Sequence, residues 1–312
     1  MTPRQIVQLV LVAALWGGVF LLVKYALVDF SAVEVAFFQA AIGALGLFII
    51  VRIEGGEARS KLNDILRRPG PALLLGASAI AVPFMLIAFG ELTVPSGLAG
   101  VLASTAPIFI ALFAPVLAHN MEVNRRQGAG LIVGLIGVAL VVGAHFIGSL
   151  GQLFGALAVL GAAASGGLSS FVVALQYKDK GIPASTTSFF ALSVGALLTL
   201  PVAVVTAPRE LPSAWAVLAV IALGLLCTAV AFMLYYSLID QIGEERASLA
   251  TYLTPAFALL YGVLLLGESL TVAAVIGLVL IIVGAEITLR GASNHCSGGD
   301  LRTQYQVHPP FH

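Results

Sequence analysis

The chain has 312 residues, of which 60% are hydrophobic and only 10% are charged, and its formal net charge is zero. A soluble domain carries roughly a quarter charged residues, so this composition excludes a soluble globular protein and predicts lipid as the solvent for most of the chain. The neutral balance argues against a strongly acidic or basic partner surface, and no nucleic-acid partner is expected. Cys227 lies in an apolar run and Cys296 in a polar segment, so the cysteines predict neither a disulfide framework nor a metal site.

Ten apolar stretches are long enough to cross roughly 30 Å of hydrocarbon as helices. Proline, glycine and charged residues mark many of their limits, as at 69–71 and 267–269. The first stretch is expected to be a retained helix and not a signal peptide, because the second half of the chain has a matching segment. The fold class expected is therefore an all-α integral membrane protein with ten transmembrane helices, near residues 5–27, 31–51, 71–90, 95–118, 127–147, 151–175, 184–206, 214–238, 246–266 and 270–290.

The two halves of the chain are related by an internal repeat. Segments 84–112 and 232–260 align without gaps at an offset of 148. A half-length duplication in a hydrophobic chain is typical of secondary transporters. The repeated positions are Phe84/Phe232, Met85/Met233, Leu86/Leu234, Ala99/Ala247, Pro107/Pro255, Phe109/Phe257 and Leu112/Leu260, with Phe37-Phe38 and Gly43 recurring as Phe189-Phe190 and Gly195, and Gly130 and Gly137 as Gly277 and Gly284.

Basic residues are distributed unevenly between the two sides of the predicted membrane. With the N-terminus inside, inner segments hold 13 Lys and Arg residues, and outer segments hold only Lys24 and Arg209. The positive-inside rule then predicts cytoplasmic termini in a plasma (inner) membrane. Five spans per repeat is an odd number, so we expect residues 1–148 to form one five-helix repeat and residues 149–290 a second, inverted one. Residues 291–312 are expected to be a disordered cytoplasmic tail.

Charged residues inside a membrane usually mark function, and here each lies in a loop or near the end of a span. Lys24 and Glu34 flank the first outer loop and are expected to pair at the interface, and Glu286 and Arg290 to pair at a helix end. No buried carboxylate is expected to bind a coupling proton, and no buried Lys or Arg to bind phosphate. This pattern favours neutral or zwitterionic solutes.

The core therefore offers aromatic, hydroxyl and amide groups as candidates for solute contact. Trp16 lies near the midplane beside two glycines, and Ser165 is its counterpart in the second half. Gln39 lies about 12 Å along the second helix. For Trp16, packing against the glycines and lining a cavity both remain open. For Gln39, an interhelical hydrogen bond and solute contact both remain open.

The repeated prolines are the second group of candidates. A proline inside a helix lacks its own N–H and frees the carbonyl four residues earlier. Pro107 would free the carbonyl of Ala103, and Pro255 that of Thr251. Freed carbonyls and neighbouring hydroxyls can either bind an ammonium and a carboxylate or simply satisfy the kink. The neighbouring candidates are Ser104, Thr105, Thr251, Tyr252 and Thr254.

Glycine pairs at helical spacing predict close helix packing. The spacings 130/134 and 151/155 both belong to this class.

These residues resemble the drug/metabolite transporter superfamily, and in particular its ten-helix EamA-type family, over 5–290. Trp16, Pro107 and the Gly130/Gly137 pair fit the first half of the family pattern, and Pro255, Gly267-Glu268 and Gly277/Gly284 fit the second. The first half departs at residues 119–121, where Gly-Glu would be expected, so Glu268 is interpreted as structural. The resemblance implies export of amino acids, amines or other metabolites, and the amino-acid exporters are the subgroup most similar overall.

The function expected is export of neutral, hydrophobic or aromatic amino acids by alternating access. Exporters of other metabolites, drugs or amines are the alternative, and a sugar-phosphate exchanger, a nucleotide-sugar exchanger or a channel is less favoured. Motifs of intramembrane enzymes are missing from the sequence. A small-molecule solute and the lipid bilayer are the partners expected, with no cofactor and no obligate protein partner. The residues expected to line a central cavity are Trp16, Gln39, Ser104, Thr105, Pro107, Ser165, Thr251, Tyr252, Thr254 and Pro255.

Overall fold

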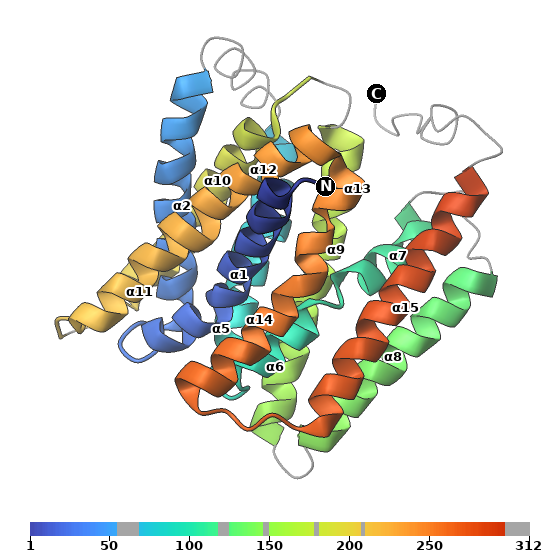
Figure 1. The fold of residues 1–312 in the computed structure, drawn as a ribbon. Coiled ribbons are helices and arrows are strands. Elements are labelled where there is room, and N and C mark those ends of the chain that lie inside the picture. The colour runs from blue at the N-terminus through green and yellow to red at the C-terminus, as the bar shows by residue number, and fades with distance from the viewer. Residues whose placement is uncertain (55–68, 118–124, 146–149, 178–180, 207–209, 297–312) are drawn as a thin grey trace.

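A computed structural model describes residues 1–54, 69–117, 125–145, 150–177, 181–206 and 210–296, and these residues form helices joined by short loops, without a strand (Figure 1). The first half contains α1 (Pro3–Ala26), α2 (Ala32–Glu54), α4 (Pro69–Gly76), the π-helical segment η1 (Ala77–Ala81), α5 (Val82–Glu91), α6 (Ser96–Ala103), α7 (Ala106–Leu117) and α8 (Arg125–His145). The second half contains α9 (Leu150–Gln176), α10 (Ala184–Val205), α11 (Ala214–Gly224), the π-helical segment η2 (Leu225–Val230), α12 (Ala231–Ile242), α13 (Glu244–Ala247), α14 (Leu249–Leu266) and α15 (Val272–Cys296).

The predicted membrane spans are confirmed as helices. Within the described ranges, nine helical segments are long and apolar enough to cross a membrane, and Val272–Thr288 is a shorter apolar helix. Each of the ten predicted stretches falls on one of these segments. The last helix, α15, continues to Cys296, beyond the predicted limit at 290, and the rest of the predicted tail, 297–312, lies outside the described residues.

The π-helical segments lie at equivalent positions of the two halves. The first begins at Ala77 and the second at Leu225, which is the offset of 148 that relates the repeated sequence segments. A π-turn leaves backbone groups without their usual partners, and in η2 the Thr228 hydroxyl donates to the carbonyl of Leu223 at 3.0 Å. The repeat therefore extends from sequence to a local backbone irregularity.

Equivalent helices of the two halves also make equivalent contacts. The first helix of the first half, α1, packs against α11, α12 and α14, and its counterpart α9 packs against α5, α6 and α7. The two second helices, α2 and α10, pack against each other, and so do the two fifth helices, α8 and α15. This exchange of equivalent contacts is what two inverted five-helix repeats produce.

The contact between α8 and α15 depends on the repeated glycines. A Cβ placed on Gly284 would lie 2.4 Å from the backbone nitrogen of Gly134, and one on Gly137 would lie 2.8 Å from the carbonyl oxygen of Gly277. Real side chains do not fit at such distances, so glycine permits the two backbones to approach. The predicted role of the glycine spacing in close packing is confirmed here.

Large apolar side chains also cover the outside of the bundle. Val205, Leu211 and Leu264 are among many that are strongly exposed. In water these residues would be costly, whereas in a bilayer they meet hydrocarbon. The apolar composition is thus divided between the helix interfaces and a lipid-facing perimeter.

One predicted span has a different form in the structure. Stretch 95–118 is not a single kinked helix, because α6 ends at Ala103 and α7 begins at Ala106. Pro107 is the second residue of α7, a position where a missing N–H costs little. The fourth span is therefore broken, whereas the ninth, which carries Pro255, continues as α14.

Candidate functional site

The break between α6 and α7 lies near the middle of the molecule, and the backbone of Ser104 and Thr105 leaves the α-helical conformation at this point. The backbone N–H of Ser104 donates to the carbonyl of Gly100, and that of Thr105 donates to the carbonyl of Leu102, both at 3.2 Å. The two hydroxyls donate to carbonyls three residues earlier, Ser104 Oγ at 2.6 Å and Thr105 Oγ1 at 2.7 Å. These local bonds satisfy part of the backbone that leaves the helix, which is the condition for irregular backbone at membrane depth.

The equivalent stretch of α14 stays helical around Pro255. The hydroxyl of Thr251 donates to the carbonyl of Ser248 at 2.6 Å, and that of Thr254 to the carbonyl of Ala250 at 3.0 Å. Serine and threonine commonly return their hydroxyls to the backbone in membrane helices. The two copies of the proline motif therefore differ, with a broken helix on one side and a continuous helix on the other.

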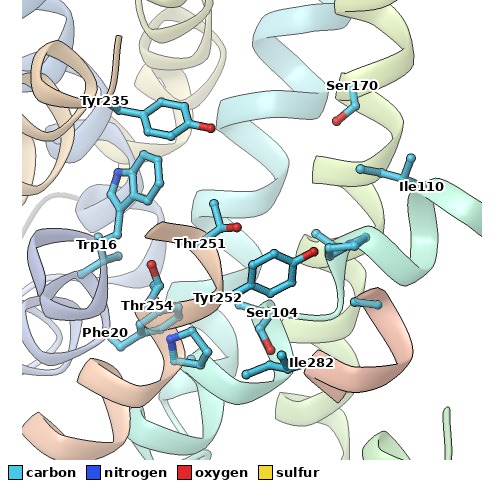
Figure 2. A pocket seen from close by; sticks show the side chains of 17 residues that line it. Trp16, Phe20, Ser104, Ile110, Ser170, Tyr235, Thr251, Tyr252, Thr254 and Ile282 are labelled. Carbon is cyan, nitrogen blue, oxygen red and sulfur yellow. The ribbon is translucent and has the colours of Figure 1, made fainter. Parts of the chain in front are cut away.

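A cavity of about 510 Å³ lies between these two segments (Figure 2). Trp16 and Tyr235 form one side, Ile110 and Ser170 face them from the other, and Tyr252 lies between the two sides. None of the 17 lining residues has an ionisable acid or basic side chain of the Asp, Glu, Lys or Arg type. The lining residues are Trp16, Val19, Phe20, Gly100, Ala103, Ser104, Ala106, Pro107, Ile110, Ser170, Tyr235, Thr251, Tyr252, Thr254, Pro255, Ile282 and Ala285.

Trp16 is held at the cavity wall by aromatic neighbours. Its ring centroid lies 4.8 Å from that of Tyr235 and 6.2 Å from that of Phe232, the latter nearly perpendicular at 76°. Offset and edge-to-face pairs of this kind are worth about 0.5–1.5 kcal/mol beyond the apolar area that they bury. The adjacent Gly17 allows α1 to approach α14, since a Cβ there would lie 2.5 Å from the Cβ of Phe257.

The structure brings most of the predicted site residues together. Seven of the ten line the central cavity, namely Trp16, Ser104, Pro107, Thr251, Tyr252, Thr254 and Pro255. Gln39 lies in a separate cavity of about 100 Å³ that shares Trp16 and Val19 with the first. Its side-chain nitrogen donates to Thr228 Oγ1 at 3.4 Å, which is the interhelical hydrogen bond considered from the sequence.

Thr105 and Ser165 do not line either cavity. Thr105 is buried, with its hydroxyl on the carbonyl of Leu102. Ser165 Oγ donates to the carbonyl of Ser78 at 2.8 Å, at the π-helical segment η1. Both hydroxyls therefore serve backbone groups in this structure.

Several cavity residues were missed from the sequence. Phe20 is one turn beyond Trp16 on the same helix, and helical spacing would have placed it on the same face. Tyr235 follows Phe232 by three residues in the repeated segment, a spacing that puts both aromatic rings on one face of a helix. Ser170 and Ile110 face the cavity because α7 and α9 pack against each other there, and no local sequence pattern predicts that contact.

The predicted distribution of charge requires two corrections. Lys24 does not pair with Glu34; its ammonium donates to the backbone carbonyls of Glu91 and Val94, and the Glu34 carboxylate accepts the N–H of Ser31 at 2.7 Å. Buried carboxylates also exist, because Glu34 is 3% exposed and Glu91 is 0% exposed. Sequence position alone placed both near span ends, and packing of neighbouring helices decided their burial.

Asp29, in the loop between α1 and α2, joins the two halves outside the spans. It accepts hydrogen bonds from the hydroxyl and the backbone N–H of Ser213, the N-cap of α11. These bonds favour the charged form and lower the pKa of the Asp29 carboxyl below its ordinary value. They also fix the start of α11 against the loop between α1 and α2.

A helical membrane protein with two matching halves and a cavity at their interface has the architecture of a secondary transporter. The model of the EamA-like transporter family matches the chain twice, over residues 4–143 and 153–290. The chain therefore belongs to the EamA-like transporter family, and it is a multi-pass membrane protein of the transporter class.

Relatives of known sequence are also named as transporters. The uncharacterized transporter YoaV of Bacillus subtilis (strain 168) is 29% identical over 289 residues, covering 90% of this chain and 95% of YoaV. A probable terminal-alkyne amino-acid exporter of Streptantibioticus cattleyicolor is 26% identical over 293 residues, covering 92% and 94%. The uncharacterized inner membrane transporter YedA of Escherichia coli (strain K12) is 26% identical, covering 82% and 81%.

A solved crystal structure superposes on the chain with a TM-score of 0.62 at 22% identity, covering 94% of this chain and 99% of the other. Identity at this level supports the fold alone.

Proposed function

We propose that this transporter exports small neutral or zwitterionic metabolites, with hydrophobic and aromatic amino acids as its preferred substrates. The observation that carries the proposal is the cavity of about 510 Å³ at the interface of the two repeats, which joins an aromatic side to hydroxyl groups and has no Asp, Glu, Lys or Arg among its described lining residues. Pockets of about 300–1,000 Å³ suit small organic ligands. The similarity to a probable amino-acid exporter agrees with this substrate class.

The two sides of the cavity suggest how such a substrate is held. Trp16, Phe20 and Tyr235 offer apolar and aromatic surface to a side chain. The hydroxyl oxygens of Ser104 and Tyr252 offer acceptors to an ammonium, and the backbone at the broken span offers further polar groups to an ammonium and a carboxylate. A phosphorylated solute would lack a cationic partner here, because no Lys or Arg of the described residues lines the cavity.

Alternating access follows from the repeat. Each repeat contributes to both walls of the cavity, and exchanging the conformations of residues 1–148 and 149–290 would expose it to the other side. We propose that the termini face the cytoplasm and that the membrane is the plasma (inner) membrane, because 13 of the 15 Lys and Arg residues lie on that side.

An exporter of amines is the second candidate. The carboxylate of Glu286 lies on α15 one residue after the cavity residue Ala285 and acts electrostatically on the cavity residue Tyr252. A carboxylate at this position would favour a cation through Tyr252. Glu286→Gln separates the two candidates, since it should weaken transport of an amine more than that of a zwitterionic amino acid.

The test is uptake and counterflow in liposomes that contain the purified protein. A panel of aromatic amino acids, aliphatic amino acids, amines and sugar phosphates is offered with and without a pH gradient. We expect transport of hydrophobic and aromatic amino acids, and inhibition of it by others of that class. Transport confined to phosphorylated solutes would overturn the proposal.

A further inference from the structure

A cluster of charged and polar residues lies beside the central cavity, toward the end of the bundle where α1 ends. On α1, Lys24 is one turn beyond the cavity residue Phe20, and on α6, Gly97 is about one turn before the cavity residue Gly100. One turn is about 5.4 Å of helix. We call this the Lys24 end; in Figure 1 it is the lower end, opposite the N-terminus, where α6 begins and α14 joins α15.

Two of the charged groups at the Lys24 end are satisfied by backbone groups. The Lys24 ammonium donates to the carbonyls of Glu91 and Val94, at the end of α5. The Glu268 carboxylate accepts the N–H groups of Ser96 at 2.6 Å and Gly97 at 2.9 Å, at the start of α6. A helix N-terminus carries partial positive charge, so its free N–H groups are suitable donors to a carboxylate.

The Gly-Glu sequence after α14 explains how Glu268 reaches α6. Gly267 has a φ of +66° and ends α14 in the left-handed conformation, which glycine adopts without strain. The backbone N–H of Glu268 then donates to the carbonyl of Gly262 at 2.9 Å. A Cβ at Gly262 would lie 2.4 Å from a Glu268 carboxylate oxygen, so glycine is required there too.

The Glu91 carboxylate, in contrast, accepts no hydrogen bond from the described residues. It is 0% exposed, and neither of its carboxylate oxygens has a hydrogen-bond partner among the described residues. The hydroxyl of Ser96, five residues along the chain and also 0% exposed, is in the same condition. An ionised carboxylate that is removed from water without donors is costly, and protonation removes most of this cost.

The charges around Glu91 lead to the same conclusion. Lys24 on α1 and Glu268 after α14 are the charged groups that act on it. Of the other elements packed against α5, neither α6, α9 nor η1 carries Asp, Glu, Lys or Arg, and Glu34 on α2 is bonded to the Ser31 amide. With all three groups ionised, this enclosed cluster would hold one cation and two anions. A single bound proton makes the net charge of the cluster zero. Glu91 is the carboxylate that accepts no hydrogen bond from a described residue, whereas Glu268 accepts two, so the proton is assigned to Glu91.

We propose that Glu91 is a proton-binding site of the closed Lys24 end, and that opening this end releases the proton. Opening has to part Lys24 from α5 and Glu268 from α6, which admits water to Glu91 and stabilises its ionised form. Each opening therefore loses one proton, and each closing takes one up. Under the proposed orientation the proton exchanges with the outside, so external acid favours closure. The proposal rests on alternating access and is independent of the substrate.

Infrared spectroscopy of the purified protein in lipid nanodiscs tests the proton directly. We expect the C=O stretching band of a protonated carboxyl group at neutral pH in the unmodified protein. Glu91→Gln should abolish this band, and the matched control Glu34→Gln, which changes another buried carboxylate at the same end, should leave it intact. Lys24→Gln removes the cation of the cluster and should let the band persist to a higher pH than in the unmodified protein, so the proton is testable even when Glu91→Gln does not fold.

Cysteine labelling tests the link between the proton and opening. The reporter is Val94→Cys, a position that is 0% exposed, and the reference is Leu92→Cys, which is 54% exposed, both with Cys227 and Cys296 replaced by alanine. A membrane-impermeant maleimide should label the reporter faster relative to the reference as pH rises, by up to about tenfold per unit for one linked proton. Adding Glu91→Gln should flatten this dependence, and adding Glu34→Gln should not.

The outcomes separate this proposal from the proposed substrate. A missing carboxyl band, a band that persists in Glu91→Gln, or a labelling ratio that does not change with pH would overturn the proton site. Neither measurement uses a substrate, so failure of amino-acid transport would leave both results interpretable. Conversely, loss of the proton site would leave the cavity and its substrate class untouched.

Discussion

Replacing Trp16 by alanine should weaken transport of aromatic substrates because Trp16 supplies a large part of one cavity wall. Its ring is held against Tyr235 at 4.8 Å and Phe232 at 6.2 Å, so its face is presented to the cavity in one orientation. An aromatic contact contributes about 0.5–1.5 kcal/mol beyond area burial, and losing about 40 Å² of apolar contact adds roughly 1 kcal/mol. A loss of about 1.5–2.5 kcal/mol raises KM by about tenfold to sixtyfold.

The assay is initial-rate transport of an aromatic amino acid into proteoliposomes. Trp16→Phe keeps a ring and should raise KM by about threefold or less. Trp215→Ala is the matched control, because Trp215 is the second tryptophan of the chain, is 79% exposed and does not line the cavity. In a Trp215→Phe background the emission of Trp16 alone reports on substrate binding. An unchanged KM in correctly inserted Trp16→Ala would refute the assignment of this wall to substrate binding.

Three further predictions concern stability. Gly284→Val should disrupt the α8–α15 contact, lower the free energy of unfolding by about 2 kcal/mol or more and thereby lower the melting temperature, whereas Gly128→Val, where a Cβ meets nothing, should change neither. Equal effects of the two substitutions would contradict the packing. Thr228→Val removes the acceptor of the Gln39 amide and the donor to the Leu223 carbonyl, and it should lower the free energy of unfolding in denaturant titration by about 1 kcal/mol. An unchanged free energy of unfolding would show that neither bond stabilises the fold. The pKa of Asp29 is lowered in the folded protein, so its bonds to Ser213 stabilise the fold above about pH 4, and this stabilisation is lost as pH falls through the pKa of the folded state. Asp29→Asn should therefore narrow the difference in melting temperature between neutral and acid pH. An unchanged difference would show that the Asp29–Ser213 bonds do not stabilise the fold.

Much of the fold was readable from sequence because the bilayer imposes strong rules on a chain. A span needs about twenty apolar residues and internal hydrogen bonding, and these conditions alone located all ten helical segments. The glycine repeat was readable for a similar reason, since close approach of two helices excludes side chains whatever their partners are. The form of the fourth span was not readable, because a proline at 107 is compatible with a kink in one helix or with the start of another.

The candidate site was predicted in part. Trp16 and the hydroxyls near the repeated prolines were found because polar or aromatic groups at membrane depth are unusual wherever they occur. Thr105 and Ser165 have the same chemistry but do not line the cavity, because helix rotation and crossing decide which side chains face it. Ser170 reaches the cavity for the same reason, with no signal in its own segment.

The sequence by itself determined that the chain is a ten-helix membrane protein with duplicated halves, because hydropathy, length and repetition are properties of the chain alone. Only the tertiary structure decided which groups are removed from water together. Glu91 lies at the end of its helix by sequence, yet α1, α6 and the turn after α14 enclose it beside Lys24 and Glu268. Burial of a charge depends on neighbours that are distant in the chain, and no local pattern of residues records them.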